Sequence, residues 1–436
     1  MKTTPGTRYT RIALPLATAA LLTLSACGSG SEESGEAADS AIDPADFSIN
    51  LDDCTDPAAV TEEITDTFTI GYSAPLSGPV AGAVELATAG YDARIAAENE
   101  AGGIDGVMIE VIYKDDAFAP DKAKANGTEF IDSIGVDALA TFGTGPLSAM
   151  VDDQNAACVP MLYPSSSTKD YVDIEEFPWT TTILPLAENE AKFLVDLIQD
   201  RYDEDVKVGI AENETASGSV QSEAFQAAAE DAGLEITAIV SDADPVAAAT
   251  ELLSQDVEVV YHGGVTGTCA AFDIASGRVG YEPDLVLKPS NCVNAVEYIS
   301  AGDAADGIEL GAFGKDPNAP ENADDEGVAL YREQMEAAGV PEDVIGNAVA
   351  VSGWTQADLV INTLKQAAAS DDGLTRLSVM AAARDQDYAS PMLINGIQWY
   401  STPELLTGID GFRPITWNAA EQRFEPAGEV ISIRPE

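Results

Sequence analysis

The stretch FTIGYSAPLSGP, residues 68–79, decides the fold class that this sequence predicts. Its first five residues, mostly aromatic or β-branched, predict a strand, and the Ser, Pro and Gly residues that follow predict a turn. A helical pattern covers residues 83–100 and ends at Gly102 and Gly103, because glycine commonly terminates helices. A second apolar strand is predicted at 108–113, so the chain opens as a strand–helix–strand unit.

This alternation of strands and helices continues along the chain. Short apolar strands separated by helices predict parallel sheets that are covered by helices on both faces, which is an α/β fold. Further strands are predicted at 138–142, 160–163, 207–211, 235–240, 257–262 and 284–288. Further helices are predicted from Pro120 and at 188–201, 220–232, 245–253 and 268–276. Residues 309–436 predict a more helical block, with helices at 351–368 and 375–383.

Length and charge exclude several classes of function. The 436 residues include 75 Asp or Glu, 21 Lys or Arg and one His, for a net charge of -54. This length predicts two domains, and the acidity argues against nucleic-acid binding, which needs Lys and Arg for phosphate contacts. The single His and the lack of a Gly-x-Ser-x-Gly elbow argue against a hydrolase. We therefore expect no enzyme, no cofactor and no metal site.

The first 26 residues predict a cleaved signal peptide. Lys2, Arg8 and Arg11 precede thirteen uncharged residues, 12–24, and this run is too short to span a bilayer. The sequence LSACG at 24–28 resembles a bacterial lipobox, which predicts lipidation of Cys27 as the first residue of the mature chain. An ordinary signal peptide without lipidation is the alternative.

Residues 27–67 predict the lipidated cysteine and an acidic tether. Residues 28–67 contain no Lys or Arg, and acidic linkers extend by self-repulsion. The mature domain is thus expected outside the cytoplasm, held at the cell membrane by its lipid. Phe47, Ile49 and Leu51 could dock the later part of the tether onto the domain.

Four cysteines remain after Cys27, and an exported chain with an even number of them predicts two disulfides. Three pairings are possible. We favour Cys269–Cys292, which follow two strands expected to be neighbours, and Cys54–Cys158, which would join the tether to the body. Four buried free thiols are the alternative.

The loops at the carboxyl ends of the predicted strands are small and polar, and none carries a catalytic constellation. Ligands of open parallel sheets bind at these ends, where hydroxyls and helix-start amides can hold a carboxylate. The loops concerned are 73–78, 143–145, 165–168, 212–219, 263–264 and 289–291.

Several motifs, in order, resemble the branched-chain amino-acid-binding proteins, the Leu/Ile/Val group of type I periplasmic receptors of ABC transporters. The motifs are IGYSAPLSGP at 70–79, AENEAGGIDG at 97–106, Asp115 and Asp116 with Pro120, VEVVYHGG at 257–264 and AGDAADG at 301–307. The resemblance implies two Rossmann-like lobes joined by a hinge of three crossovers, with the ligand in the cleft between them. Lobe 1 would comprise 68–183 and 313–400, lobe 2 would comprise 184–312, and 401–436 would form the last crossover and the end of lobe 2.

The resemblance also implies a binding site, with departures. The family holds an amino-acid carboxylate with two lobe-1 loops that match Thr144-Gly145 and Ser165–Ser167, although these hydroxyls could simply cap helices. An acid that grips the ligand ammonium matches about Ser290, which carries no charge, and an aromatic residue that often follows the Gly-Gly is Val265. This puts a branched-chain amino acid in doubt. The candidate ligand residues are Ser77, Thr144, Gly145, Ser165, Ser166, Ser167, Glu212, Val265, Ser290 and Asn291; His262 is interpreted as a packing residue.

The predicted function is a lipid-anchored receptor that captures a small polar solute, an amino acid or a related carboxylate or amide. Its expected partners are the permease and ATPase of an ABC importer, and it is expected to be a monomer. The alternative is a sensory domain of the same fold that acts through a signalling partner.

Overall fold

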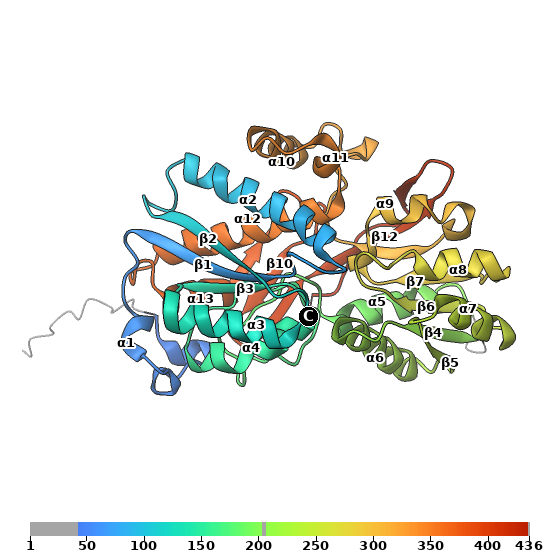
Figure 1. Cartoon of the computed structure of the whole chain (residues 1–436), viewed down its shortest axis with the longest axis horizontal. Coiled ribbons are helices and arrows are strands. Elements are labelled where there is room, and N and C mark those ends of the chain that lie inside the picture. Colours follow the sequence, from blue (N-terminus) through green and yellow to red (C-terminus); the bar gives the residue numbers. More distant parts are fainter. Residues whose placement is uncertain (1–41, 203–205, 435–436) are drawn as a thin grey trace, which may run out of the picture. The chain divides into compact units, whose positions relative to one another are not determined.

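The computed structural model describes residues 42–202 and 206–434. The predicted signal peptide, Cys27 and the first part of the tether lie outside these residues. Within the described part of the chain, no helix is both long and apolar enough to cross a membrane. Two main sheets carry the architecture, and helices flank each of them (Figure 1).

The first sheet has the strand order β2-β1-β3, and all its strands are parallel, as predicted. The predicted strand at 160–163 is reduced to a single bridging residue, Met161, which pairs with Leu139 and Thr180. Pro160 and Pro164 explain the difference, because proline has no N–H to donate to a sheet ladder. The strands are β1 (Thr67–Ala74), β2 (Met108–Asp115) and β3 (Ala138–Thr141).

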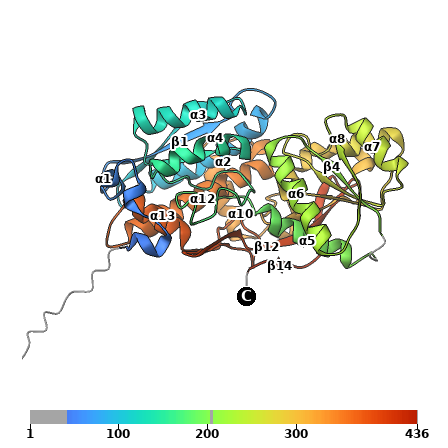
Figure 2. The same cartoon turned by 90° about the horizontal axis from the view of Figure 1, so that it is seen from below.

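Helices α2 (Ala81–Glu100) and α12 (Ala348–Ala368) cover one face of this sheet, and α3 (Pro120–Glu129) and α4 (Thr144–Ala156) cover the other (Figures 1 and 2). Helices α2 and α12 lie far apart in sequence but pack closely. A Cβ atom on Gly90 would collide with the carbonyl oxygen of Ala350, and one on Gly353 with that of Ala87. These two glycines therefore let the backbones approach.

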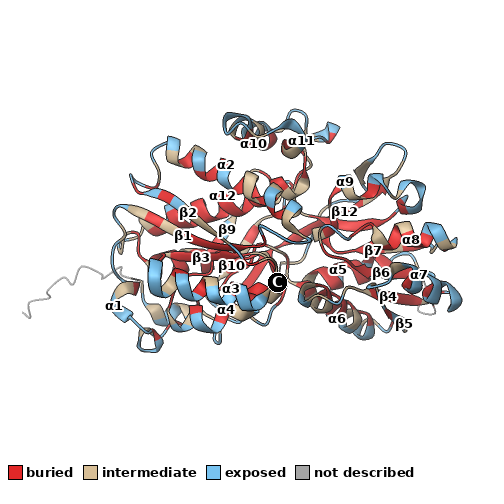
Figure 3. Ribbon diagram, viewed as in Figure 1, coloured by how far each residue is buried: buried red, intermediate tan, exposed pale blue. Residues whose placement is uncertain are grey.

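The second sheet has the order β13-β12-β8-β7-β6-β4-β5, with β14 (Ile431–Ser432) paired to β12. Its parallel strands are β4 (Val208–Glu212), β5 (Ile236–Ser241), β6 (Val259–Gly263), β7 (Leu285–Lys288) and β8 (Glu309–Ala312). Its flanking helices are α5 (Ala187–Gln199), α6 (Ala216–Asp231), α7 (Pro245–Ser254), α8 (Ala271–Val279) and α9 (Ala295–Ile299). The central strands are buried along their length, while the helices bury one stripe each (Figure 3).

The prediction of a helical block at 309–436 is right as far as Arg384 and wrong beyond it. The helices there are α10 (Glu326–Ala337), α11 (Glu342–Ile345), α12 and α13 (Arg376–Arg384). Strands follow: β9 (Gln386–Tyr388), β10 (Trp399–Thr402) and β11 (Leu405–Ile409) form an antiparallel sheet, and β12 (Gly411–Asn418) and β13 (Arg423–Pro426) join the second main sheet antiparallel. The β-branched and aromatic residues of 405–418 favour strands.

The chain passes three times between the part that contains the first main sheet and the part that contains the second. This agrees with the fold that the resemblance implied. The third passage lies at Asp410, because β11 ends at Ile409 in one sheet and β12 begins at Gly411 in another. The Asp410 carboxylate accepts a hydrogen bond from the Gln398 amide at 2.7 Å and pairs with Arg434 at 2.8 Å. The expected boundary between residues 400 and 401 falls inside β10.

Residues 42–66, which we call the N-terminal strap, dock onto the body. The strap contains η1 (Pro44–Phe47), η2 (Leu51–Asp53) and α1 (Pro57–Val60). Cys54 forms a disulfide with Cys158, as favoured from the sequence, and the neighbouring Thr55 amide donates to the Ala156 carbonyl at 2.8 Å. Ile49 is buried, and Phe47 and Leu51 pack partly buried on the core.

Candidate functional site

A cavity of about 310 Å³ lies where the loops at the carboxyl ends of both main sheets meet. Open parallel sheets bind ligands at this edge, so the position of the cavity fits the fold. Six of the predicted ligand residues line it: Ser165, Ser166, Ser167, Val265, Ser290 and Asn291.

The start of α4 supports the hydroxyl-rich wall of the cavity. Gly143 precedes the helix with φ 95°, and a Cβ there would collide with the ring of Phe118, so only glycine fits. This turn brings the Thr144 hydroxyl to 2.9 Å from the Ser166 hydroxyl. The Thr144 amide donates to Oγ of Ser217, on α6, at 3.3 Å. Thr144 thus positions Ser166, and the α4 amides face the same region as the hydroxyls.

The opposite wall offers neutral carboxamides. Gln221 on α6 is only 3% exposed, and its Oε1 has no hydrogen-bond partner among the described residues. Oδ1 of Asn291 is buried and unpartnered in the same part of the chain. Both residues line the cavity. Because a buried polar atom without a partner is costly, these carboxamides are natural contacts for polar groups of a solute.

Ser290 occupies the position where the resemblance places an acid, and a carboxylate from another element lies behind it. Glu190 on α5 is 3% exposed, and its Oε1 accepts a hydrogen bond from the Ser290 amide at 2.6 Å. Burial raises the pKa of Glu190 to about 7, against an ordinary value of 4.5, although the bonds from Ser290 act in the opposite direction. Glu190 is not among the cavity-lining residues, so it anchors the Ser290 loop from outside.

Replacing Glu190 with Gln is expected to change how stability depends on pH. The folded protein holds the Glu190 proton more tightly than the unfolded chain, so its stability falls as the pH rises from about 4.5 to about 7. The E190Q variant lacks this loss and should gain roughly 3 kcal/mol on the wild type between pH 4.5 and pH 8. Urea unfolding at both pH values measures the difference; parallel pH profiles for the two proteins would contradict it.

Four of the predicted ligand residues do not line the cavity. Thr144 acts through Ser166, as described above, and Gly145 lies one residue further along α4. Ser77 is exposed and donates its hydroxyl proton to Asp115 at 2.6 Å. Glu212 accepts a hydrogen bond from Ser219 at 3.0 Å.

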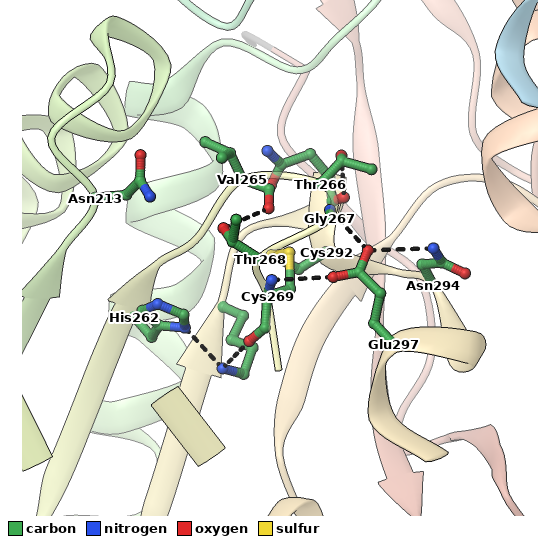
Figure 4. Close-up of a disulfide and its surroundings, with 12 residues drawn as sticks. Asn213, His262, Val265, Thr266, Gly267, Thr268, Cys269, Cys292, Asn294 and Glu297 are labelled. Carbon is green, nitrogen blue, oxygen red and sulfur yellow. Dashed lines mark hydrogen bonds between the residues drawn. A yellow bond between two sulfur atoms is a disulfide. The ribbon is translucent and has the colours of Figure 1, made fainter. Parts of the chain in front are cut away.

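The second disulfide, Cys269–Cys292, joins two cavity loops and agrees with the favoured pairing (Figure 4). Glu297 accepts hydrogen bonds from the Gly267 and Cys269 amides at 2.9 and 3.0 Å. The Thr266 hydroxyl donates to the Asn291 carbonyl at 2.8 Å. The loops that carry Val265 and Asn291 are therefore tied together by covalent and polar contacts.

A buried charged cluster lies beneath this disulfide. Lys288 is fully buried. Its Nζ donates hydrogen bonds to Nδ1 of His262 and to the Cys269 carbonyl, each at 2.9 Å. The same Nζ lies 3.0 Å from Oδ2 of Asp273. His262 also contacts Asp242 at 3.1 Å through Nε2. Burial, with the Lys288 charge, lowers the pKa of His262 to about 4, so the ring is neutral at pH 7. His262 is thus a packed and hydrogen-bonded residue, as interpreted from the sequence.

Among the cavity-lining residues that the sequence did not indicate are Ser217, Gln221 and Arg413. Ser217 lies within 212–219, the segment predicted as a binding loop, but only Glu212 of that segment was predicted as a ligand residue. Gln221 lies one helical turn further on, a position that helix periodicity could have indicated. Arg413 comes from β12, in the block whose strands were not predicted.

Comparisons with known proteins support the fold described above. The family described as periplasmic binding protein matches residues 67–403. The Leu-, Ile-, Val-, Thr- and Ala-binding protein of Pseudomonas aeruginosa is 24% identical over 266 residues, which cover 58% of this chain and 69% of that protein.

Solved structures show the same fold. A branched-chain amino-acid ABC transporter protein from Thermus thermophilus with bound valine superimposes with a TM-score of 0.75 at 19% identity, covering 85% of this chain and 97% of that one. A solute-binding protein of an ABC transporter from R. palustris in complex with benzoate gives a TM-score of 0.69 at 20% identity, covering 84% and 98%.

Proposed function

Because the chain belongs to the periplasmic binding protein family, of the branched-chain amino-acid ABC-transporter type, we propose that it captures a small polar solute in this cavity and delivers it to an ABC importer. The observation that carries the proposal is the cavity between the hydroxyls of Ser165–Ser167 and the carboxamides of Gln221 and Asn291. Receptors of this kind close around their ligand by a hinge.

The solute is proposed to be an amino acid or a related carboxylate or amide. Hydroxyls beside the start of α4 suit an acceptor group such as a carboxylate. The ligands named for two of the structural neighbours, valine and benzoate, share a carboxylate. The carboxamides of the opposite wall can accept or donate further hydrogen bonds.

A ligand screen tests this proposal directly. Amino acids, amides, urea-like compounds and aromatic acids are added to the purified mature domain, and the melting temperature is recorded. A solute at a hundred times its dissociation constant should stabilise the protein by about 2.7 kcal/mol. Stabilisation by a sugar or a metal ion alone would reject the proposal. A separate observation concerns the neighbouring genes: signalling genes in place of permease and ATPase genes would favour the sensory alternative.

The S166A/S167A double variant is expected to bind a stabilising solute from that screen at least about tenfold more weakly, because a buried hydrogen bond lost from a polar group costs about 1–3 kcal/mol. Both serines are nearly fully buried and line the cavity. Isothermal titration calorimetry gives the affinity, and S254A, on the exposed end of α7, is the matched control. Unchanged affinity in the double variant would place the site elsewhere.

We also propose that the mature protein is anchored by lipid at Cys27 through the acidic tether, as a monomer outside the cytoplasm. The two disulfides support an oxidising compartment. We also propose the lobe boundaries that the resemblance implies. Incorporation of labelled fatty acid into the wild type but not into the C27S variant is the expected result; labelling of both would remove Cys27 as the site.

A further inference from the structure

Arg413 stands out among the cations of this acidic chain. Of the Lys and Arg residues within 42–202 and 206–434, it is the only partly buried one whose side chain makes neither a hydrogen bond nor an ion pair with a described residue. The other cations in that part of the chain that make no such contact, Lys122, Lys192 and Arg278, are exposed to solvent. With 75 acids available, a half-buried guanidinium without a partner needs an explanation.

Arg413 lines the cavity from the strand of the third crossing. It lies on β12 directly opposite Ala312 of β8, and Ala312 lines the cavity too. The side chains of Phe313, Ile415 and Phe424 line the same cavity. Apolar neighbours lower the local dielectric constant, so the charge of Arg413 acts strongly on a group that enters the cavity.

The two other cations that line the cavity have partners of their own. Lys315 pairs with Asp325 at 2.9 Å, and Arg423 pairs with Glu425. Two acids, Asp316 and Glu321, also line the cavity, and neither forms an ion pair with a cation of the described residues. Arg413 is therefore left to a group from outside the described chain.

The position where the resemblance places an acid for the ligand ammonium is neutral in this cavity. Ser290 occupies the position where the resemblance places an acid, and the nearest carboxylate behind it, Glu190, accepts the backbone amide of Ser290 and does not line the cavity. Gln221 and Asn291 carry no charge. The position that the resemblance assigns to a ligand ammonium is therefore uncharged, whereas Arg413 offers a cation to a ligand carboxylate.

We propose that Arg413 binds an acidic group of the solute, so that the cavity selects a small organic carboxylate over the corresponding zwitterionic amino acid. A guanidinium fits a carboxylate through paired N–H donors. This inference rests on the proposed function and narrows its solute class.

The test uses matched acids and amides on two carbon skeletons, isocaproate with isocaproamide and benzoate with benzamide, together with L-leucine, which is isocaproate with an added ammonium group. Isocaproate or benzoate should bind the wild type at least about tenfold more tightly than its amide, and isocaproate more tightly than leucine. R413Q should lose this preference, R413K should keep part of it, and the exposed control R278Q should keep all of it. Added salt should weaken binding of the anion to the wild type and to R278Q, but not to R413Q.

Leucine or an amide binding best, or a carboxylate preference that R413Q retains, would overturn the role of Arg413 while leaving solute capture intact. Failure of all five probes to bind would also overturn it. Failure of every compound in the broader screen would reject the proposed function itself, so the two failures are distinguishable.

Discussion

Replacement of Lys288 by Met should lower the free energy of unfolding by about 3–5 kcal/mol. The ammonium group is fully buried and donates to His262 and to the Cys269 carbonyl, while Asp273 completes the ion pair at 3.0 Å. Removing it leaves the buried Asp273 without a counter-charge. Burial raises the pKa of Asp273 and lowers that of Lys288, while the charge of each partner acts in the opposite direction and favours the charged form.

The K288M/D273L double variant should recover most of this loss, because replacing both members of a buried pair by apolar residues is often neutral. The matched control is K207M. The Lys207 side chain is 44% exposed and lies 3.6 Å from an exposed Asp256, so its loss should cost less than about 1 kcal/mol. Urea unfolding followed by circular dichroism measures all four proteins. A K288M cost no larger than that of K207M would show that the buried cluster does not stabilise the fold.

Removal of the Cys54–Cys158 disulfide by the C54S/C158S variant should cost about 4–5 kcal/mol. The bond closes a loop with a sequence separation of 104 residues, and the chain-entropy model assigns about 4.7 kcal/mol to a loop of about 100 residues. The same variant should speed hydrogen exchange at the Thr55 and Ile64 amides, which donate to Ala156 and Leu374.

The C269S/C292S variant is the matched comparison, because its sequence separation is only 23 and the expected cost is about 3 kcal/mol. It should leave exchange in the N-terminal strap unchanged and instead loosen the cavity loops that carry Val265 and Asn291. Urea unfolding and hydrogen exchange separate the two effects. If the shorter loop cost as much as the longer one, chain entropy would not explain the stabilisation by the strap.

The α/β alternation up to Lys288 was predictable because each of its elements carries its own local signal. Gly102 and Gly103 end α2, and Pro120 begins α3, whatever lies around them. The prediction of a strand at 160–163 was wrong because its apolar residues lie between two prolines. The hydrogen bonds of a sheet are made by the backbone, so the hydropathy of the side chains does not ensure them. The strands after Arg384 were not predicted, although β9, β10 and β11 pair with one another and β13 pairs with β12; only β12 has a partner, β8, that lies far away in sequence.

The binding loops were found in part. Ser165–Ser167, Ser290 and Asn291 line the cavity because they follow strands, and strand ends of a parallel sheet meet at one edge. Ser77 and Glu212 also follow strands, yet their side chains bond to Asp115 and Ser219 instead. Sequence position places a residue at the edge of the sheet, but it does not decide where the side chain points.

The sequence by itself indicated the family, the α/β class, two disulfides and some of the loops that line the cavity, because each depends on local pattern, chain order or a cysteine count. Only the tertiary structure decided that Glu190 lies behind Ser290 and that Lys288 is buried with Asp273. It also decided that Arg413 lines the cavity from β12, which lies near the C-terminal end of the chain. The physical reason is that burial and charge pairing depend on which distant segments pack together, and a single sequence does not display that arrangement.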